Sequence, residues 1–321
     1  MIFEITTFII SIIVLAWLSS SFVKTLIEIA RYLHWREFIV AFFVMGCAAS
    51  LPNLFVDLSA AFQHLAPISF GDIIGGNLID LTLIMAIVVF FSRGTVSTDS
   101  RMVQGSSIFT FFIAVLPIFL IWNGRVTQWE GAVLIVAFLV YAYWLFSKDD
   151  RFKKIYSKAK KESSLPSVRK WVFVKNIVKI ILILVVLLLA SQGIIRSAQY
   201  FAGSLGVSLS LVGILIVALG NCFPEMYFGL ISGRKAESWM IVGDMMGSVI
   251  VCATLVLGII GVLAPFQIKD MAPFFLARVF TIIAALFFLV IVRTGKKITK
   301  KEALLLLFVY MIFLLTEIFS K

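Results

Sequence analysis

Ten apolar runs, each long enough to cross a lipid bilayer, make up most of this sequence. A transmembrane helix needs about 20 mostly apolar residues. Charged or Gly/Pro-containing clusters separate the runs, which lie at 3–22, 38–62, 71–91, 107–122, 130–147, 175–192, 206–232, 239–263, 272–292 and 303–319. Of the 321 residues, 61% are hydrophobic and 14% are charged, which excludes a water-soluble enzyme. We therefore expect an all-α polytopic membrane protein with ten transmembrane helices.

The basic residues are distributed unevenly between the loops. If the polar loop 148–174 is cytoplasmic, ten spans place 23 of the 28 Lys and Arg residues on that side. Such an excess is typical of cytoplasmic loops. It predicts a multi-pass protein of the cell membrane, with a basic cytoplasmic loop and with both termini outside the cytoplasm. Because topology and anionic lipid account for the net charge of +11, we expect no nucleic-acid partner.

An internal repeat relates the two halves of the chain. One constant shift in residue number, the repeat shift, aligns Pro52 with Pro224, and Gly71-Asp72-Ile73-Ile74-Gly75 with Gly243-Asp244-Met245-Met246-Gly247. Five spans precede the loop and five follow it, and an odd number gives the two copies opposite orientations. We therefore expect one five-helix repeat in 1–147, the loop in 148–174 and an inverted five-helix repeat in 175–321. Inverted repeats with interrupted helices are typical of transporters whose ion site lies near the bilayer midplane.

Five acidic residues fall inside the repeat regions: Asp57, Asp72, Asp80, Glu225 and Asp244. A charged side chain at the bilayer centre costs about 2.5–3.5 kcal/mol. No Lys or Arg is expected at the same depth, so a bound metal cation or bound protons would have to neutralise these acids. Asp57, or the pair Asp72 and Asp244, could instead lie near an interface in contact with water. Proline inside a span also frees backbone carbonyls, and an all-oxygen environment favours hard cations such as Na⁺ and Ca²⁺.

These motifs resemble the alpha-repeats of the sodium/calcium exchangers, members of the cation/calcium antiporter superfamily. The first copy reads Ala48-Ala49-Ser50-Leu51-Pro52-Asn53 and then Gly71-Asp72-Ile73-Ile74-Gly75-Gly76-Asn77. The second reads Gly220-Asn221-Cys222-Phe223-Pro224-Glu225 and then Gly243-Asp244-Met245-Met246-Gly247-Ser248. The family pattern is G-T-S-x-P-E followed by G-x-x-x-G-S-N-x-x-N or D. The resemblance implies ten spans, cation antiport and movement of the first and sixth helices past a fixed core.

The resemblance also implies a ligand set, in which several positions are altered. Ser50, Glu225 and Ser248 match the family ligands, whereas Asn53 stands where the first repeat has glutamate. Asp80 occupies a position that is usually asparagine, and Cys252 one that is usually aspartate. The predicted metal ligands are Ser50, Asn53, Asp80, Asn221, Glu225 and Ser248, and the further candidates are Asp57, Asp72, Asn77, Cys222, Asp244 and Cys252.

Charge balance at this site gives a hypothesis for the exchange. The two central acids, Asp80 and Glu225, neutralise one divalent ion or two monovalent ions in turn. We therefore expect a secondary active antiporter that exchanges a divalent cation, most simply Ca²⁺, for two Na⁺ or two H⁺. Asp57 lies one helical turn beyond Asn53 and could add a third charge, which leaves the stoichiometry open.

Other functions compete with this one. A proton-coupled exchanger, or one selective for Mg²⁺ or Mn²⁺, fits the altered ligands, because cavity size and charge separate these ions. A cation channel or a non-transporting scaffold fits the missing acids at Asn53 and Cys252. We expect no catalytic residues and no cofactor. The expected partners are inorganic cations and the lipid bilayer, and the oligomeric state is open, a monomer included.

Overall fold

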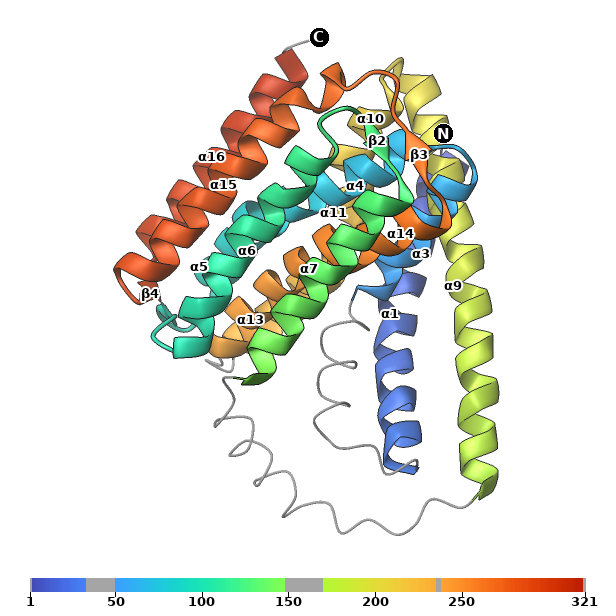
Figure 1. The fold of residues 1–321 in the computed structure, drawn as a ribbon, viewed down its shortest axis with the longest axis horizontal. Helices are drawn as coiled ribbons and strands as arrows, with labels where there is room; N and C mark the ends of the chain where they lie inside the picture. Colours follow the sequence, from blue (N-terminus) through green and yellow to red (C-terminus); the bar gives the residue numbers. More distant parts are fainter. Residues whose placement is uncertain (1, 33–49, 148–169, 235–237, 320–321) are drawn as a thin grey trace.

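The computed structural model describes residues 2–32, 50–147, 170–234 and 238–319, which form a bundle of helices (Figure 1). The first half contains α1 (Ile2–Tyr32), α3 (Leu51–Phe62), α4 (Ala66–Ile79), η2 (Asp80–Ile84), α5 (Met85–Phe91), β1 (Val96–Ser97), α6 (Arg101–Leu120), β2 (Arg125–Val126) and α7 (Gln128–Ser147). The second half contains α9 (Lys170–Leu205), α10 (Leu209–Leu211), η3 (Val212–Val217), α11 (Ala218–Asn221), α12 (Phe223–Arg234), α13 (Ser238–Ile250), η4 (Val251–Val256), α14 (Leu257–Leu263), β3 (Phe266–Gln267), η5 (Ala272–Phe274), α15 (Phe275–Thr294), β4 (Lys297–Ile298) and α16 (Lys300–Phe319). The prediction of an all-α polytopic membrane protein is confirmed.

Eight helices in the described part of the chain are long and apolar enough to cross a membrane. Two further apolar stretches, Ile2–Leu18 within α1 and Leu51–Phe62 (α3), are shorter in the described residues. They correspond to the first and second expected spans. Residues 38–49 of the second span and 148–169 of the central loop lie outside the described residues. The described helices therefore follow the expected order, and eight of them meet both the length and the hydropathy of a span in the described residues.

Several helices begin or end beyond the apolar runs that predicted them. α6 begins at Arg101 rather than at residue 107, because Gln104 in its first turn donates hydrogen bonds to the carbonyls of Thr98 and Val292. α9 continues to Leu205 rather than to residue 192, and there Ser197 donates to the backbone carbonyl of Glu4 at 3.0 Å. Polar side chains that bond to distant segments of the chain thus extend both helices past their apolar segments.

Two antiparallel strand pairs show that the halves are inverted. β1 pairs with β4, and β2 pairs with β3, so each pair joins one half of the chain to the other. The repeat shift carries Arg125 of β2 onto Lys297 of β4, and it carries β1 into the loop that holds β3. The two pairs are therefore repeat equivalents, and they lie at opposite ends of the bundle (Figure 1). Equivalent segments at opposite ends are what an inverted repeat requires.

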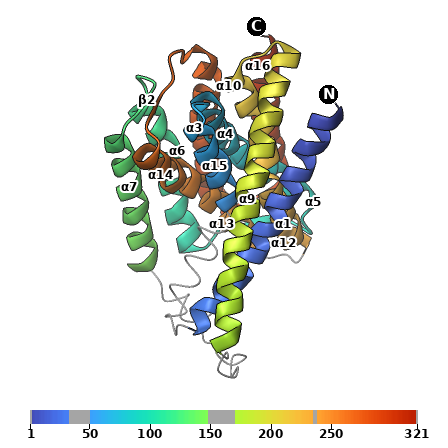
Figure 2. The same ribbon diagram turned by 90° about the vertical axis from the view of Figure 1, so that its right-hand side faces the viewer.

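The buried apolar residues form two separate clusters. The larger one joins α4, α5, α6, α7 and α13 to α16. The smaller one joins α1 and α9 to α3 and η3, and includes Leu15, Val56, Leu187 and Val217. α1 and α9 run side by side along one edge of the bundle (Figure 2). The two long helices thus pack with α3 and η3 in a core that is separate from the larger cluster.

The helix that carries the first repeat motif packs very closely against the second repeat. A Cβ added at Gly75 would lie 2.8 Å from the Cα of Ile214 in η3. A Cβ added at Gly71 would lie 2.9 Å from the carbonyl oxygen of Ser210. Only glycine allows this separation between α4 and the segment α10–η3. The close crossing positions the acids of α4 beside the second half of the chain.

Candidate functional site

Two candidate acids lie near the middle of two membrane-spanning segments. Asp80 falls in the middle third of the span 66–91, and Glu225 falls in the middle third of the span 209–234. Both side chains are buried. Because an α-helix rises about 1.5 Å per residue, each acid is roughly 13 Å or more from either end of its span. The two acids therefore lie deep within their apolar segments, away from the ends of those segments.

Irregular turns position these residues. The helix that carries Asp80 changes to a π-helical turn, η2, at that residue, and the equivalent helix changes to η4 at Val251, next to Cys252. Thr82 donates its hydroxyl to the carbonyl of Leu78, and its repeat equivalent Thr254 does the same to Ile250. In the second repeat α11 ends at Asn221 and α12 begins at Phe223, so Pro224 lies in the first turn of a new helix. Such interruptions frequently mark functional sites.

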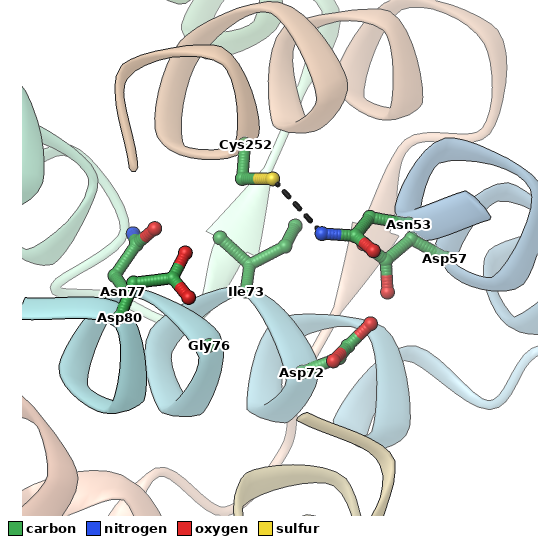
Figure 3. A pocket seen from close by; sticks show the side chains of 8 residues that line it. All are labelled: Asn53, Asp57, Asp72, Ile73, Gly76, Asn77, Asp80 and Cys252. Atoms are coloured by element: carbon green, nitrogen blue, oxygen red, sulfur yellow. Dashed lines mark hydrogen bonds between the residues drawn. The ribbon is translucent and has the colours of Figure 1, made fainter. Parts of the chain in front are cut away.

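The repeat relates two side-chain pairs at the centre. The repeat shift carries Asn53 onto Glu225 and Asp80 onto Cys252. Asn53 donates its amide to the sulfur of Cys252 at 3.2 Å, which joins α3 to η4 (Figure 3). Asp80 and Glu225, the equivalent pair, are close enough to interact electrostatically. The Asn53–Cys252 pair is therefore neutral and hydrogen-bonded, while the equivalent Asp80–Glu225 pair, the acidic half of the site, carries two carboxylates.

The acidic half has oxygen atoms available for a cation. Ser248 donates its hydroxyl to Glu225 Oε1 at 3.3 Å and also interacts with the Asp80 carboxylate. Within the described residues, Asp80 Oδ1 and Glu225 Oε2 are buried and have no hydrogen-bond partner. A buried carboxylate without a partner is costly unless a cation or a proton neutralises it. The structure thus brings together Asp80, Glu225 and Ser248 as one oxygen-rich group.

A small cavity lies beside this group, on the side of the first repeat. Its volume is about 10 Å³, and it is lined by Asn53, Asp57, Asp72, Ile73, Gly76, Asn77, Asp80 and Cys252 (Figure 3). Asn221 of α11 donates its side-chain amide to Asp72 Oδ2 at 2.5 Å, which ties the second repeat to α4. Space of this size accommodates about one water-sized sphere. The cavity therefore suits a single ion stripped of most of its water.

The remaining predicted ligands have different positions. Asn77 lines the cavity next to Asp80, and Cys222 donates its thiol to the carbonyl of Gly76 at 3.7 Å. Ser50 is buried at the start of α3 but does not line the cavity. Asp244 of α13 is only partly buried, and it also lies outside the cavity lining, although its charge acts on Glu225. Asp72 and Asp244, equivalent in sequence, are thus placed differently.

No three His, Cys, Asp or Glu side chains converge in the described ranges closely enough to hold a metal ion. A cation at this centre would need hydroxyl, amide or backbone carbonyl oxygens in addition to the two central carboxylates. Ser248, Asn77 and Asn53 supply oxygens of this kind. A donor set of oxygen atoms suits Na⁺ and Ca²⁺ better than soft metals, which prefer sulfur.

Two features of the site were absent from the sequence prediction. The π-helical turns were not foreseen, although the repeated threonines Thr82 and Thr254 gave a signal at equivalent positions. Ser69 was not a candidate, yet its buried hydroxyl lies near the carboxylate of Asp57. No motif identifies this serine, because its position next to Asp57 depends on how α3 packs against α4.

The comparisons with known proteins agree with the architecture. The family model described as sodium/calcium exchanger protein matches residues 3–147 and 175–319. A sodium/calcium exchanger, MaX1 of Methanosarcina acetivorans, is 24% identical, and the match covers 92% of this chain and 93% of that protein.

Two solved structures share the fold. One is the sodium-calcium exchanger NCX_Mj, with a TM-score of 0.63 and 22% identity over 98% of this chain and 99% of that chain. The other is the H⁺/Ca²⁺ exchanger CAX, with a TM-score of 0.74 and 16% identity over 98% of this chain and 82% of that chain. Both matches extend over nearly the whole chain, so the fold is shared throughout and not only at the motifs.

Proposed function

The chain belongs to the sodium/calcium exchanger protein family, and on this premise we propose that it exchanges a divalent cation, Ca²⁺ in the first place, for Na⁺. Members of this family are membrane transporters rather than enzymes, and cation antiport is the activity that the family and the fold support. The finer proposal rests on the Asp80–Glu225 pair. Ser248 interacts with both carboxylates, and each acid has one buried oxygen without a hydrogen-bond partner among the described residues.

The charge of this pair explains exchange rather than leak. Two carboxylates with one divalent ion, or with two monovalent ions, are neutral overall and can change access across the membrane at low cost. Without an ion the same carboxylates are two buried charges in a medium of low dielectric constant, and that state is costly. Alternating access would move α1 and α9 past the remaining helices, and the smaller apolar cluster, in which they pack against α3 and η3, would be the surface along which they move. The proposed location is the cell membrane, with both termini outside the cytoplasm.

Reconstituted transport tests the proposal. Purified protein in Na⁺-loaded proteoliposomes is diluted into Na⁺-free medium with ⁴⁵Ca²⁺, and uptake is expected only when the Na⁺ gradient is present. The same vesicles with a proton gradient test the second candidate, H⁺-coupled exchange, which the likeness to the H⁺/Ca²⁺ exchanger CAX favours. Uptake without any gradient would favour a channel. No uptake under either gradient would contradict Ca²⁺ exchange and favour another ion, such as Mg²⁺ or Mn²⁺, or a scaffold.

Charge balance gives a further prediction for the same vesicles. If two Na⁺ exchange for one Ca²⁺, no net charge moves, and the membrane potential exerts no force on the exchange. We expect the initial rate of Na⁺-driven ⁴⁵Ca²⁺ uptake to stay the same when K⁺ and valinomycin set the potential to either sign. Three Na⁺ per Ca²⁺ would instead move one charge per cycle, worth about 2.3 kcal/mol per 100 mV. A rate that rises steeply with an inside-negative or inside-positive potential would contradict the two-for-one balance.

A further inference from the structure

Two side-chain hydrogen bonds join α3 to the long helix α9. The hydroxyls of Ser59 and Ser191 lie 2.9 Å apart, and both serines are buried. Ser191 donates its own hydroxyl to the carbonyl of Leu188 at 2.8 Å, so Ser59 is the donor between the two serines. Just after α3 ends, Gln63 donates its side-chain amide to Gln192 Oε1 at 2.7 Å. These two contacts, the α3–α9 bonds, thus join neighbouring residues of α9 to one end of α3.

The α3–α9 bonds lie on the surface along which α9 is proposed to move. Ser59 is next to Ala60 in α3, Ser191 is next to Ala190 in α9, and both alanines belong to the smaller apolar cluster. Apolar contacts are non-directional, so they can re-form after one helix slides along another. A hydrogen bond instead needs its donor and acceptor within about 3.5 Å and nearly in line. Movement of α9 past α3 therefore breaks the α3–α9 bonds, while apolar packing along the surface is kept.

The second repeat cannot form the equivalent of the Ser59–Ser191 bond. The repeat shift carries α3 onto α12 and α9 onto α1. It carries Ser59 onto Ile231, whose side chain has neither a donor nor an acceptor. Among the described residues, α3 also packs more extensively against α9 than α12 packs against α1. The two equivalent contacts therefore differ in both extent and chemistry.

We propose that the α3–α9 bonds act as a latch, which favours the access state of this structure over the alternative access state. In a transporter built from inverted repeats, a change of access exchanges the conformations of the two repeats. The close contact between α3 and α9 then passes to α12 and α1, where Ile231 stands in place of Ser59. The alternative state lacks this hydrogen bond and is less populated for that reason. The inference rests on the proposed function, because it requires alternating access.

Ser59→Ala tests the latch in proteoliposomes of uniform orientation. The half-saturating Ca²⁺ concentration for ⁴⁵Ca²⁺ uptake is measured from each face of the membrane, because apparent affinity scales with the fraction of protein that is open to that face. One hydrogen bond changes an equilibrium constant by about 2–10-fold. We expect the half-saturating concentration to fall by this factor on one face and to change less than about twofold on the other. Ser204→Ala removes an exposed hydroxyl from α9 and should match the wild type on both faces.

A reversible cross-link gives a second measurement. Ser59→Cys/Ser191→Cys places two thiols where the hydroxyls lie 2.9 Å apart, which is within reach of a disulfide. Oxidation should hold α9 on α3 and stop ⁴⁵Ca²⁺ exchange, and reduction should restore it. Ser11→Cys/Gly193→Cys is the matched control, because a Cβ at Gly193 would lie 3.5 Å from the Ser11 Cβ and thus joins α1 to α9. Since these two helices move together, this disulfide should leave exchange unchanged.

The outcomes separate the latch from the proposed function. Equal changes on both faces in Ser59→Ala would indicate a purely structural effect, and either this result or no change on both faces would overturn the latch. Exchange at the wild-type rate with the 59–191 disulfide closed would overturn it as well. If the protein exchanges no Ca²⁺, amide deuterium exchange in α3 decides the matter. Faster exchange in Ser59→Ala than in Ser204→Ala would support the latch without Ca²⁺ antiport, and equal exchange would refute it.

Discussion

Asp80→Asn and Glu225→Gln are each expected to reduce divalent-cation binding by about 10²–10⁴-fold. Each substitution leaves the shape of the side chain nearly unchanged but removes one of the two central negative charges. The other carboxylate then faces a divalent ion alone in a buried site, and loss of one partner of a buried charge pair costs about 3–5 kcal/mol. Isothermal titration of the purified variants with Ca²⁺, Mg²⁺ and Mn²⁺ measures the loss and shows which ion the site prefers.

Asp270→Asn is the matched control for these variants, because Asp270 is exposed in the loop before η5. It removes the same charge far from the centre, and its affinity should equal that of the wild type. Monodisperse elution from size exclusion establishes that each variant is folded. Affinity within about twofold of wild type in both Asp80→Asn and Glu225→Gln would show that the divalent ion binds elsewhere, since a charge-pair loss is worth far more.

Gly75→Ala is expected to have the largest effect on stability. Its new methyl group would lie 2.8 Å from the Cα of Ile214, in backbone that cannot rotate away as a side chain would. α4 would have to move away from η3, and overpacking of this kind costs about 1–3 kcal/mol. Thermal unfolding of the purified variant should therefore begin at a clearly lower temperature. Because α4 carries Asp72 and leads directly into Asp80, ion binding should also weaken.

Gly203→Ala provides the comparison for this substitution. Gly203 lies in α9 and is exposed, and a Cβ added there meets nothing within 4 Å. Alanine favours a helix more than glycine does, so the melting temperature should stay the same or rise slightly. Equal melting temperatures for Gly75→Ala and Gly203→Ala would mean that α4 and η3 tolerate a wider separation than the structure shows.

The sequence predicts the architecture well because the governing signals are local or repeated. Apolar runs define the helices, and the G-D-x-x-G copies at Asp72 and Asp244 reveal the repeat. Helix ends were less accurate, because Gln104 and Ser197 extend α6 and α9 through hydrogen bonds to distant segments. Hydropathy counts such residues as polar loop, whereas tertiary contacts make them helical.

The candidate site was only partly predictable for a related reason. Sequence identifies Asp80 and Glu225 as acids within the two repeats, but it does not state which side chains meet. The hydrogen bond between Asn53 and Cys252, the position of Ile73 between two acidic groups and the partial exposure of Asp244 all depend on how helices from the two halves pack. Such contacts between helices cannot be predicted from the spacing of residues along one helix.

The strand pairs β1–β4 and β2–β3 set a mechanical limit on any rearrangement of the bundle. Each pair joins a loop of the first half to a loop of the second half by backbone hydrogen bonds. The two pairs lie at opposite ends of the molecule. Separation of the two halves would break the hydrogen bonds of both strand pairs, whereas α1 and α9 take part in neither pair. The strand pairs therefore favour movement of α1 and α9 past α3 and η3, which pack against them in the smaller apolar cluster, over separation of the two sequence repeats.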